Sequence, residues 1–216
     1  MYISLEIEMY DEIVTFMQTG GAFMYPILAV LAFGLAIAIE RYVYISAIKL
    51  NNRRLLSKLM PLLKEGDLNQ VYSITSRSKV AICQMLTLGL SRFKIKPERD
   101  QIEMAMEESL MEIIPRLEKR THYLAMFANI ATLLGLLGTI TGLIKAFTAV
   151  AQVDPSLKAE ILSSSISVAM NTTAFGLAVA IPLIIMFSIL QTKTTEVVDS
   201  LEMATVKFVN LIMIKQ

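Results

Sequence analysis

Between Arg120 and Lys145 the chain reads THYLAMFANIATLLGLLGTITGLI, which is 24 consecutive residues without Asp, Glu, Lys or Arg. A helix rises about 1.5 Å per residue, so about 20 mainly apolar residues cross the hydrocarbon core of a bilayer. We therefore predict that this stretch spans a membrane as a helix.

Two further stretches meet the same requirement. The first is the 27 uncharged residues between Glu12 and Glu40, whose apolar core lies at about 22–39. The second is the 32 uncharged residues between Glu160 and Lys193. At about 1.5 Å per residue this last stretch would extend roughly 48 Å, so part of it is expected to project beyond the bilayer.

The composition agrees with a membrane protein. Of the 216 residues, 55% are hydrophobic and 18% are charged, and the mean hydropathy is +0.58. Soluble domains have about 45–50% apolar and about 25% charged residues. We predict an all-α polytopic membrane protein with three transmembrane helices, a helical cytoplasmic domain and long helices extending out of the membrane.

The first apolar stretch is predicted to be a retained anchor. The residues before it carry four acidic groups and no Lys or Arg: Glu6, Glu8, Asp11 and Glu12. A cleaved signal peptide instead begins with cationic residues and ends at a small-residue cleavage site.

The distribution of positive charge predicts the orientation. Residues 46–120 hold fourteen of the twenty Lys and Arg residues, 1–22 hold none and 151–160 hold only Lys158. Segments next to a transmembrane helix that are rich in Lys and Arg stay in the cytoplasm. The predicted segments are an outside N-terminal segment at 1–21, transmembrane helices at 22–45, 121–150 and 161–192, a cytoplasmic helical region at 46–120, an outside hairpin at 151–160 and a cytoplasmic C-terminal helix at 193–216.

The cytoplasmic region is predicted to be helical throughout. Leucines at helical spacing are broken by Pro61 and by the turn signal at 65–67. A second helix is expected at about 80–93. A third is expected from Glu98, with Pro97 in its first turn.

The third cytoplasmic helix is expected to continue straight into the second span. Pro115 should kink it or be absorbed at a bend before the membrane. Apart from Gly135, no Gly or Pro separates Arg116 from Leu136. A Met-rich face could bind a partner, but core packing is favoured for its members, Met104, Met106 and Met111. The neighbouring acidic residues are interpreted as a solvated face: Glu107, Glu108 and Glu112.

Small residues form one narrow stripe on each of the last two spans. They recur at spacings of four, three and four: Ala131, Gly135, Gly138 and Gly142 on the second span, and Ala169, Thr173, Gly176 and Ala180 on the third. Such stripes let helix backbones approach closely in lipid, so they predict helix packing. Pro182 lies inside the third span and should bend it.

Thr139 and Thr173 lie beside these stripes and have two open interpretations. Each hydroxyl could bond to a carbonyl of its own helix one turn earlier. Alternatively, the two residues could share a polar lining of a proton pathway, because polar groups within a membrane face a bundle interior or water.

Titratable groups are absent from the deep part of every predicted span. Glu40 and Arg41 lie at the inner end of the first span, His122 at the inner end of the second and Lys145 near its outer end. These four are predicted to mark the membrane boundary. If the protein handles protons at mid-membrane, another subunit must supply the carboxylate.

The sequence offers little for soluble chemistry. With one His and one Cys, metal sites and Cys/His or Ser/His catalysis have almost no candidate residues, so we predict no enzyme activity, no metal and no cofactor. Cys83 is predicted to be a buried apolar residue. The net charge of +1 gives no reason to expect nucleic-acid binding.

Three segments resemble the MotA/TolQ/ExbB proton channel family. The segment Gly135-Leu-Leu-Gly-Thr-Ile-Thr-Gly142 is similar to the family's G-L-x-G-T-V-x-G, and Asn171-Thr-Thr-Ala-Phe-Gly-Leu-Ala-Val-Ala-Ile-Pro182 is similar to A-T-A-x-G-L-x-A-A-I-P. Glu40-Arg41 resembles the family's E-R. Three spans rather than four favour the ExbB/TolQ branch.

The resemblance implies a stator subunit in the inner membrane. It implies a homopentamer around single-span helices of an ExbD/TolR-like partner, whose intramembrane Asp carries protons, with Thr139 and Thr173 lining the pore. One departure is Val168, where well-known members carry Glu, five residues before Thr173. Lys145 is also unusual for its region.

Other function classes are weighed against this one. A membrane scaffold or assembly protein could use the same helices for packing alone. A soluble helical bundle does not fit the span lengths, and a secondary transporter does not fit three spans without an inverted repeat. The output of the motor and the choice between H⁺ and Na⁺ stay open.

Overall fold

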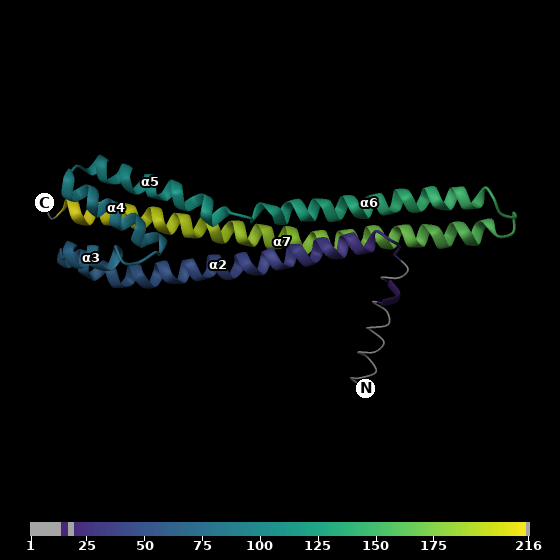
Figure 1. Ribbon diagram of the computed structural model, residues 1–216, viewed down its shortest axis with the longest axis horizontal. Coiled ribbons are helices and arrows are strands. Elements are labelled where there is room, and N and C mark those ends of the chain that lie inside the picture. Colours follow the sequence, from purple (N-terminus) through teal and green to yellow (C-terminus); the bar gives the residue numbers. More distant parts are fainter. Residues whose placement is uncertain (1–13, 17–19, 215–216) are drawn as a thin grey trace, which may run out of the picture. The chain divides into compact units, whose positions relative to one another are not determined.

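The structure, a computed structural model, describes residues 14–16 and 20–214. Its named helices are α2 (Met24–Glu65), α3 (Leu68–Thr75), α4 (Ala81–Ile95), α5 (Arg99–Glu118), α6 (His122–Val150) and α7 (Lys158–Met213) (Figure 1). No strand occurs among these residues. Three helical stretches, through α2, α5–α6 and α7, are long and apolar enough to cross a membrane. The predicted all-α membrane fold is confirmed.

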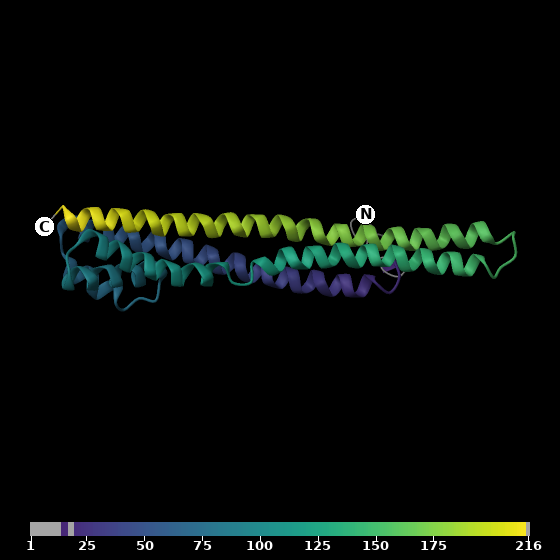
Figure 2. The same ribbon diagram turned by 90° about the horizontal axis from the view of Figure 1, so that it is seen from above.

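The chain divides into two compact units. Unit 1 comprises residues 1–38 and 122–187, and unit 2 comprises residues 39–121 and 188–216. Unit 1 therefore holds the start of α2, all of α6 and the first half of α7. In two perpendicular views, α6 and this half of α7 run side by side as an antiparallel pair (Figures 1 and 2).

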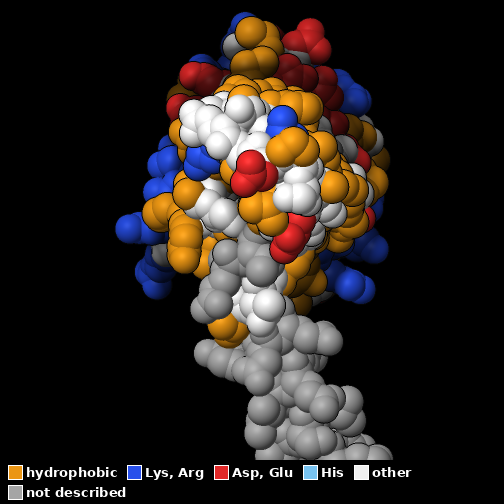
Figure 3. All heavy atoms as spheres, turned by 90° about the vertical axis from the view of Figure 1, so that its right-hand side faces the viewer, with side chains coloured by type: hydrophobic (Ala, Val, Ile, Leu, Met, Phe, Trp, Pro, Cys, Tyr) orange, Lys and Arg blue, Asp and Glu red, His pale blue; other side chains and the backbone are white. Residues whose placement is uncertain are grey.

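The surface of unit 1 is rich in exposed apolar side chains. Leu133 and Phe147 of α6 and Ile181 of α7 are more than half exposed. Hydrophobic side chains make up much of the surface seen from the end where α6 joins α7 (Figure 3). Water would disfavour so much exposed apolar area, whereas lipid tails accept it.

Unit 2 has a packed apolar core. Its largest fully buried side chains come from four helices: Leu59 and Leu63 of α2, Met85, Leu86 and Leu90 of α4, Ile102 and Met106 of α5, and Phe208 of α7. Two polar contacts also join α2 to α7 in this unit. Lys49 pairs with Glu196 at 2.5 Å, and the Lys193 ammonium lies 4.3 Å from the centre of the Tyr42 ring.

The end of α2 corrects one expectation and confirms another. Pro61 lies inside α2, so the predicted break there is wrong. The neighbouring Leu59 and Leu63 are both buried, and their burial offsets the hydrogen bond that Pro61 cannot donate. The predicted turn follows, because Gly66 has a φ of 87° and Asp67 accepts a hydrogen bond from the Gln70 amide at 3.0 Å.

The largest correction concerns the predicted unbroken helix from Glu98 into the second span. The chain breaks at residues 119–121, between α5 and α6, where Arg120 has a φ of 65°. Arg41 of α2 donates hydrogen bonds to the carbonyl oxygens of Arg116 and Leu117. An unbroken helix would use these same two oxygens, so a residue distant in the sequence stabilises the break.

Two smaller expectations for α5 are also corrected. The helix begins at Arg99 after an extended Glu98, so Pro97 lies before its first turn. Met106 is fully buried, but Met104 and Met111 are 63% and 71% exposed, because they occupy the opposite face of the helix. The expected acidic solvated face is confirmed, since its three carboxylates are exposed: Glu107, Glu108 and Glu112.

Candidate transmembrane site

The backbones of α6 and α7 approach closely at two glycines of unit 1. A Cβ atom added to Gly176 would lie 2.7 Å from the Ala131 carbonyl oxygen and 3.0 Å from the Gly135 Cα. A Cβ atom added to Gly135 would lie 3.3 Å from the Gly176 Cα. A side chain at Gly176 would therefore collide with backbone rather than with a flexible side chain, and one at Gly135 would require the α7 backbone to move by a few tenths of an ångström.

The remaining small residues extend this contact along both helices. A Cβ atom on Gly142 would lie 2.8 Å from the Ala169 Cβ, and one on Gly138 would collide with the Thr172 side chain. Ala180 is buried further along α7, and Pro182 is exposed inside the same helix. The small residues of α6 thus lie along one face of α7, which is the arrangement that close packing in lipid requires.

The hydroxyl groups of Thr173 and Thr139 make different hydrogen bonds. Thr173 Oγ1 donates to the Gly135 carbonyl oxygen on α6 at 2.9 Å, so it crosses between the helices. Thr139 Oγ1 donates to the Leu136 carbonyl oxygen of its own helix at 2.6 Å. Thr139 follows Gly135 by about one helical turn. It therefore lies near the part of α6 that Thr173 of α7 contacts.

Thr172 is a buried polar residue that the sequence reasoning missed. It is 2% exposed, and its Oγ1 lies 2.5 Å from the Gly20 carbonyl oxygen and 3.1 Å from that of Val168. A usable signal was present, because Thr172 follows Ala169 by three residues and precedes Gly176 by four. That spacing places it on the small-residue stripe.

Val168, the departure from the family pattern, lies against the chain that enters α2. A Cβ atom on Gly21 would be 3.5 Å from Val168 Cγ1, and Gly21 has a φ of 78°. Together with the bond from Thr172 to Gly20, this contact ties one turn of α7 to the two glycines before α2.

The four predicted boundary residues have different surroundings. Glu40 is exposed, and its two carboxylate oxygens each lie 3.0 Å from Arg120 Nη1. Arg41 is 3% exposed, and its guanidinium carbon lies 4.7 Å from the centre of the Tyr44 ring. His122 and Lys145 are both exposed.

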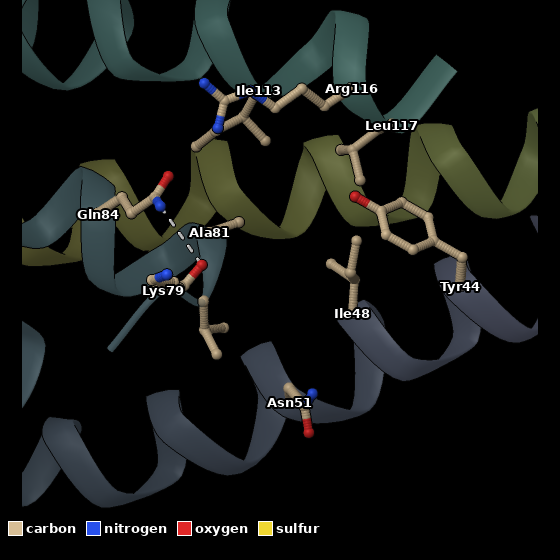
Figure 4. Close-up of a pocket in the computed structure, with 10 residues that line it drawn as sticks. Tyr44, Ile48, Asn51, Lys79, Ala81, Gln84, Ile113, Arg116 and Leu117 are labelled. Atoms are coloured by element: carbon tan, nitrogen blue, oxygen red, sulfur yellow. Dashed lines mark hydrogen bonds between the residues drawn. The ribbon is translucent and has the colours of Figure 1, made fainter. Parts of the chain in front are cut away.

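Unit 2 contains a cavity of about 320 Å³ between α2, α5 and the start of α4 (Figure 4). Apolar side chains such as Ile48 and Ile113 form part of its wall, and Lys79 and Arg116 are its charged residues. The described residues include no cluster of three potential metal ligands. Cys83 is buried as predicted, and burial raises the pKa of its thiol, which disfavours the reactive thiolate.

Comparisons with known proteins agree with the geometry. Residues 77–203 match the MotA/TolQ/ExbB proton channel family. A putative biopolymer transport protein ExbB homolog of Methanothermobacter thermautotrophicus is 24% identical over 94% of this chain and 71% of its own length. The putative ExbB-like protein 1 of Synechocystis is 29% identical over 83% of this chain and 71% of its own length.

A third relative has higher identity over a shorter region. The biopolymer transport protein exbB1 of Vibrio cholerae is 39% identical over 88 residues, which are 41% of this chain and 38% of that protein. The family match covers more than half of the chain and includes the two longer segments that carry the resemblance, 135–142 and 171–182. The chain is therefore a member of the MotA/TolQ/ExbB proton channel family.

Proposed function

We propose that this protein is the proton-channel stator subunit of an ExbB/TolQ-like motor in the inner membrane. Inward proton flow would drive motion of an ExbD/TolR-like partner. The N-terminus would lie in the periplasm, with residues 46–120 and the C-terminus in the cytoplasm. Family membership and the polar contact between α6 and α7 support this proposal.

The observation that carries the proposal is the Thr173 hydroxyl. Its proton is donated to the Gly135 carbonyl oxygen, so both oxygen lone pairs stay available to accept a hydrogen bond. Thr173 is half-buried, which leaves it accessible from one side of the helix pair. A neutral acceptor held in a fixed direction suits a pathway for water or a protonated carboxyl group.

The carboxylate itself would come from the partner. The three predicted spans contain no Asp or Glu away from their inner ends. A single-span partner with one intramembrane Asp would supply the titratable group. A homopentamer would surround that helix with five copies of Thr173 and Thr139.

The proposal is tested by removing the hydroxyl while keeping the side-chain shape. Thr173→Val should lower proton flux at least about tenfold in liposomes that contain the protein with its co-purified partner, and Thr173→Ser should restore flux. Thr148→Val is the matched control, because Thr148 is exposed and its hydroxyl donates to the Ile144 carbonyl oxygen of its own helix. Unchanged flux in Thr173→Val, with intact assembly, would exclude the pore role.

A membrane scaffold is the alternative function. The close backbone contact at Gly135 and Gly176 is as useful for assembly as for conduction. A scaffold would conduct no protons with any partner and would tolerate Thr139→Val and Thr173→Val together.

A further inference from the structure

The break between α5 and α6 replaces helical hydrogen bonds with bonds from another helix. In a continuous helix the Arg120 amide would donate to the Arg116 oxygen and the Thr121 amide to the Leu117 oxygen. Instead, the Thr121 amide donates to the Glu118 oxygen at 3.1 Å. Arg41 Nη2 donates to the Leu117 oxygen and lies 3.5 Å from the Arg116 oxygen. One guanidinium therefore contacts both acceptors that the continued helix would need.

Glu40, the residue before Arg41, contacts Arg120 within the break. Glu40 binds Arg120 through both carboxylate oxygens at 3.0 Å. The φ of 65° at Arg120 lies in the left-handed region, which is unfavourable for any residue with a Cβ. The Glu40 contact thus accompanies a backbone conformation that is unfavourable for Arg120.

The local sequence does not require the break. Residues 116–121 read Arg-Leu-Glu-Lys-Arg-Thr, without Gly or Pro, and Pro115 lies before them inside α5. The broken form also has a cost, because Arg41 Nε and Thr121 Oγ1 are buried without a hydrogen-bond partner among the described residues. A competing helical form is therefore compatible with the sequence of this segment.

We propose that residues 119–121 are a helix switch controlled by Glu40 and Arg41. When the pair is engaged, α5 and α6 are separate helices. When the pair is released, the Arg116 and Leu117 oxygens accept the Arg120 and Thr121 amides, and α5 and α6 join. The switch itself stands on the geometry of unit 2, and its effect on flux rests on the proposed channel function.

Amide hydrogen exchange of the full-length protein in lipid nanodiscs tests the switch. Arg41→Met removes the competing donor and should slow exchange in peptides covering 116–122, since the freed carbonyls then accept helical amides. Arg41→Lys keeps one donor group, so its exchange rate in this segment should lie between those of Arg41→Met and the unchanged protein. Lys49→Met is the matched control, because it removes another α2 cation, the partner of Glu196, and should leave this segment unchanged.

A second pair of variants keeps the test decisive if Arg41→Met does not fold. Arg120→Ala and Arg120→Gly both remove the Glu40 contact, so they differ only in backbone preference. Ala favours the helix and Gly tolerates the left-handed conformation, so exchange should be at least about tenfold slower in the Ala variant.

Two results would overturn the switch. One is faster or unchanged exchange in Arg41→Met, which would show that Arg41 does not compete with helix formation at residues 119–121. The other is equal exchange in the two Arg120 variants. Proton flux is measured on the same samples, so an altered exchange pattern without any flux would reject the channel function while keeping the switch.

Discussion

Gly176 lets two membrane helices pack closely because its side chain is a single hydrogen atom. Its position allows the α7 backbone to approach Ala131 and Gly135 of α6. Gly176→Ala should lower the stability of the protein by about 1–3 kcal/mol through overpacking, although Ala is normally the better helix residue. The measurement is thermal unfolding of the purified protein in one detergent.

Gly34→Ala is the matched control for this substitution. A Cβ atom on Gly34 would meet the end of the Leu183 side chain, at 2.6 Å, rather than backbone. That side chain can move, so this variant should retain more stability than Gly176→Ala. Equal losses in the two variants would show that the backbone contact between α6 and α7 is not decisive.

The threonines show what residue types alone can and cannot predict. The motif identified Asn171-Thr172-Thr173 as important, but it did not separate the two hydroxyls. Thr173 bonds across to α6, whereas Thr172 is buried against Gly20. Neighbouring helix residues point about 100° apart, so only the placement of the second helix and of the chain before α2 distinguishes them.

At the scale of elements, long-range contacts explain what the sequence pattern missed. The three helices long and apolar enough to cross a membrane could be predicted because charge is excluded from lipid, and that exclusion is visible in composition. The break at 119–121 was missed because its cause lies in α2, 75 positions away from Arg116. The continuation of α2 past Pro61 was missed because it depends on the burial of Leu59 and Leu63.

At the scale of the whole molecule, the closely packed α6–α7 pair leaves many apolar side chains exposed on unit 1. We expect purification from native membranes in mild detergent to give a complex with five copies of the 24.1 kDa chain. A single-span protein with one intramembrane Asp should accompany it. Mass determination and identification of the co-purified chain check both expectations. A monomer, or a partner without a membrane carboxylate, would favour the scaffold.

The break at 119–121 also offers a protease a place to cut the chain. Lys119 and Arg120 are exposed and outside any helix, and trypsin cuts after such residues far more readily than within a helix. Brief digestion of the folded protein should therefore cut after Lys119 and Arg120, as well as after Arg77 and Lys79, which are exposed between α3 and α4. Arg41→Met should resist the first of these cuts and keep the second. Gel electrophoresis would then report which form of the segment is populated in each lipid or at each membrane potential. Failure of trypsin to cut there in the unchanged protein would contradict this expectation.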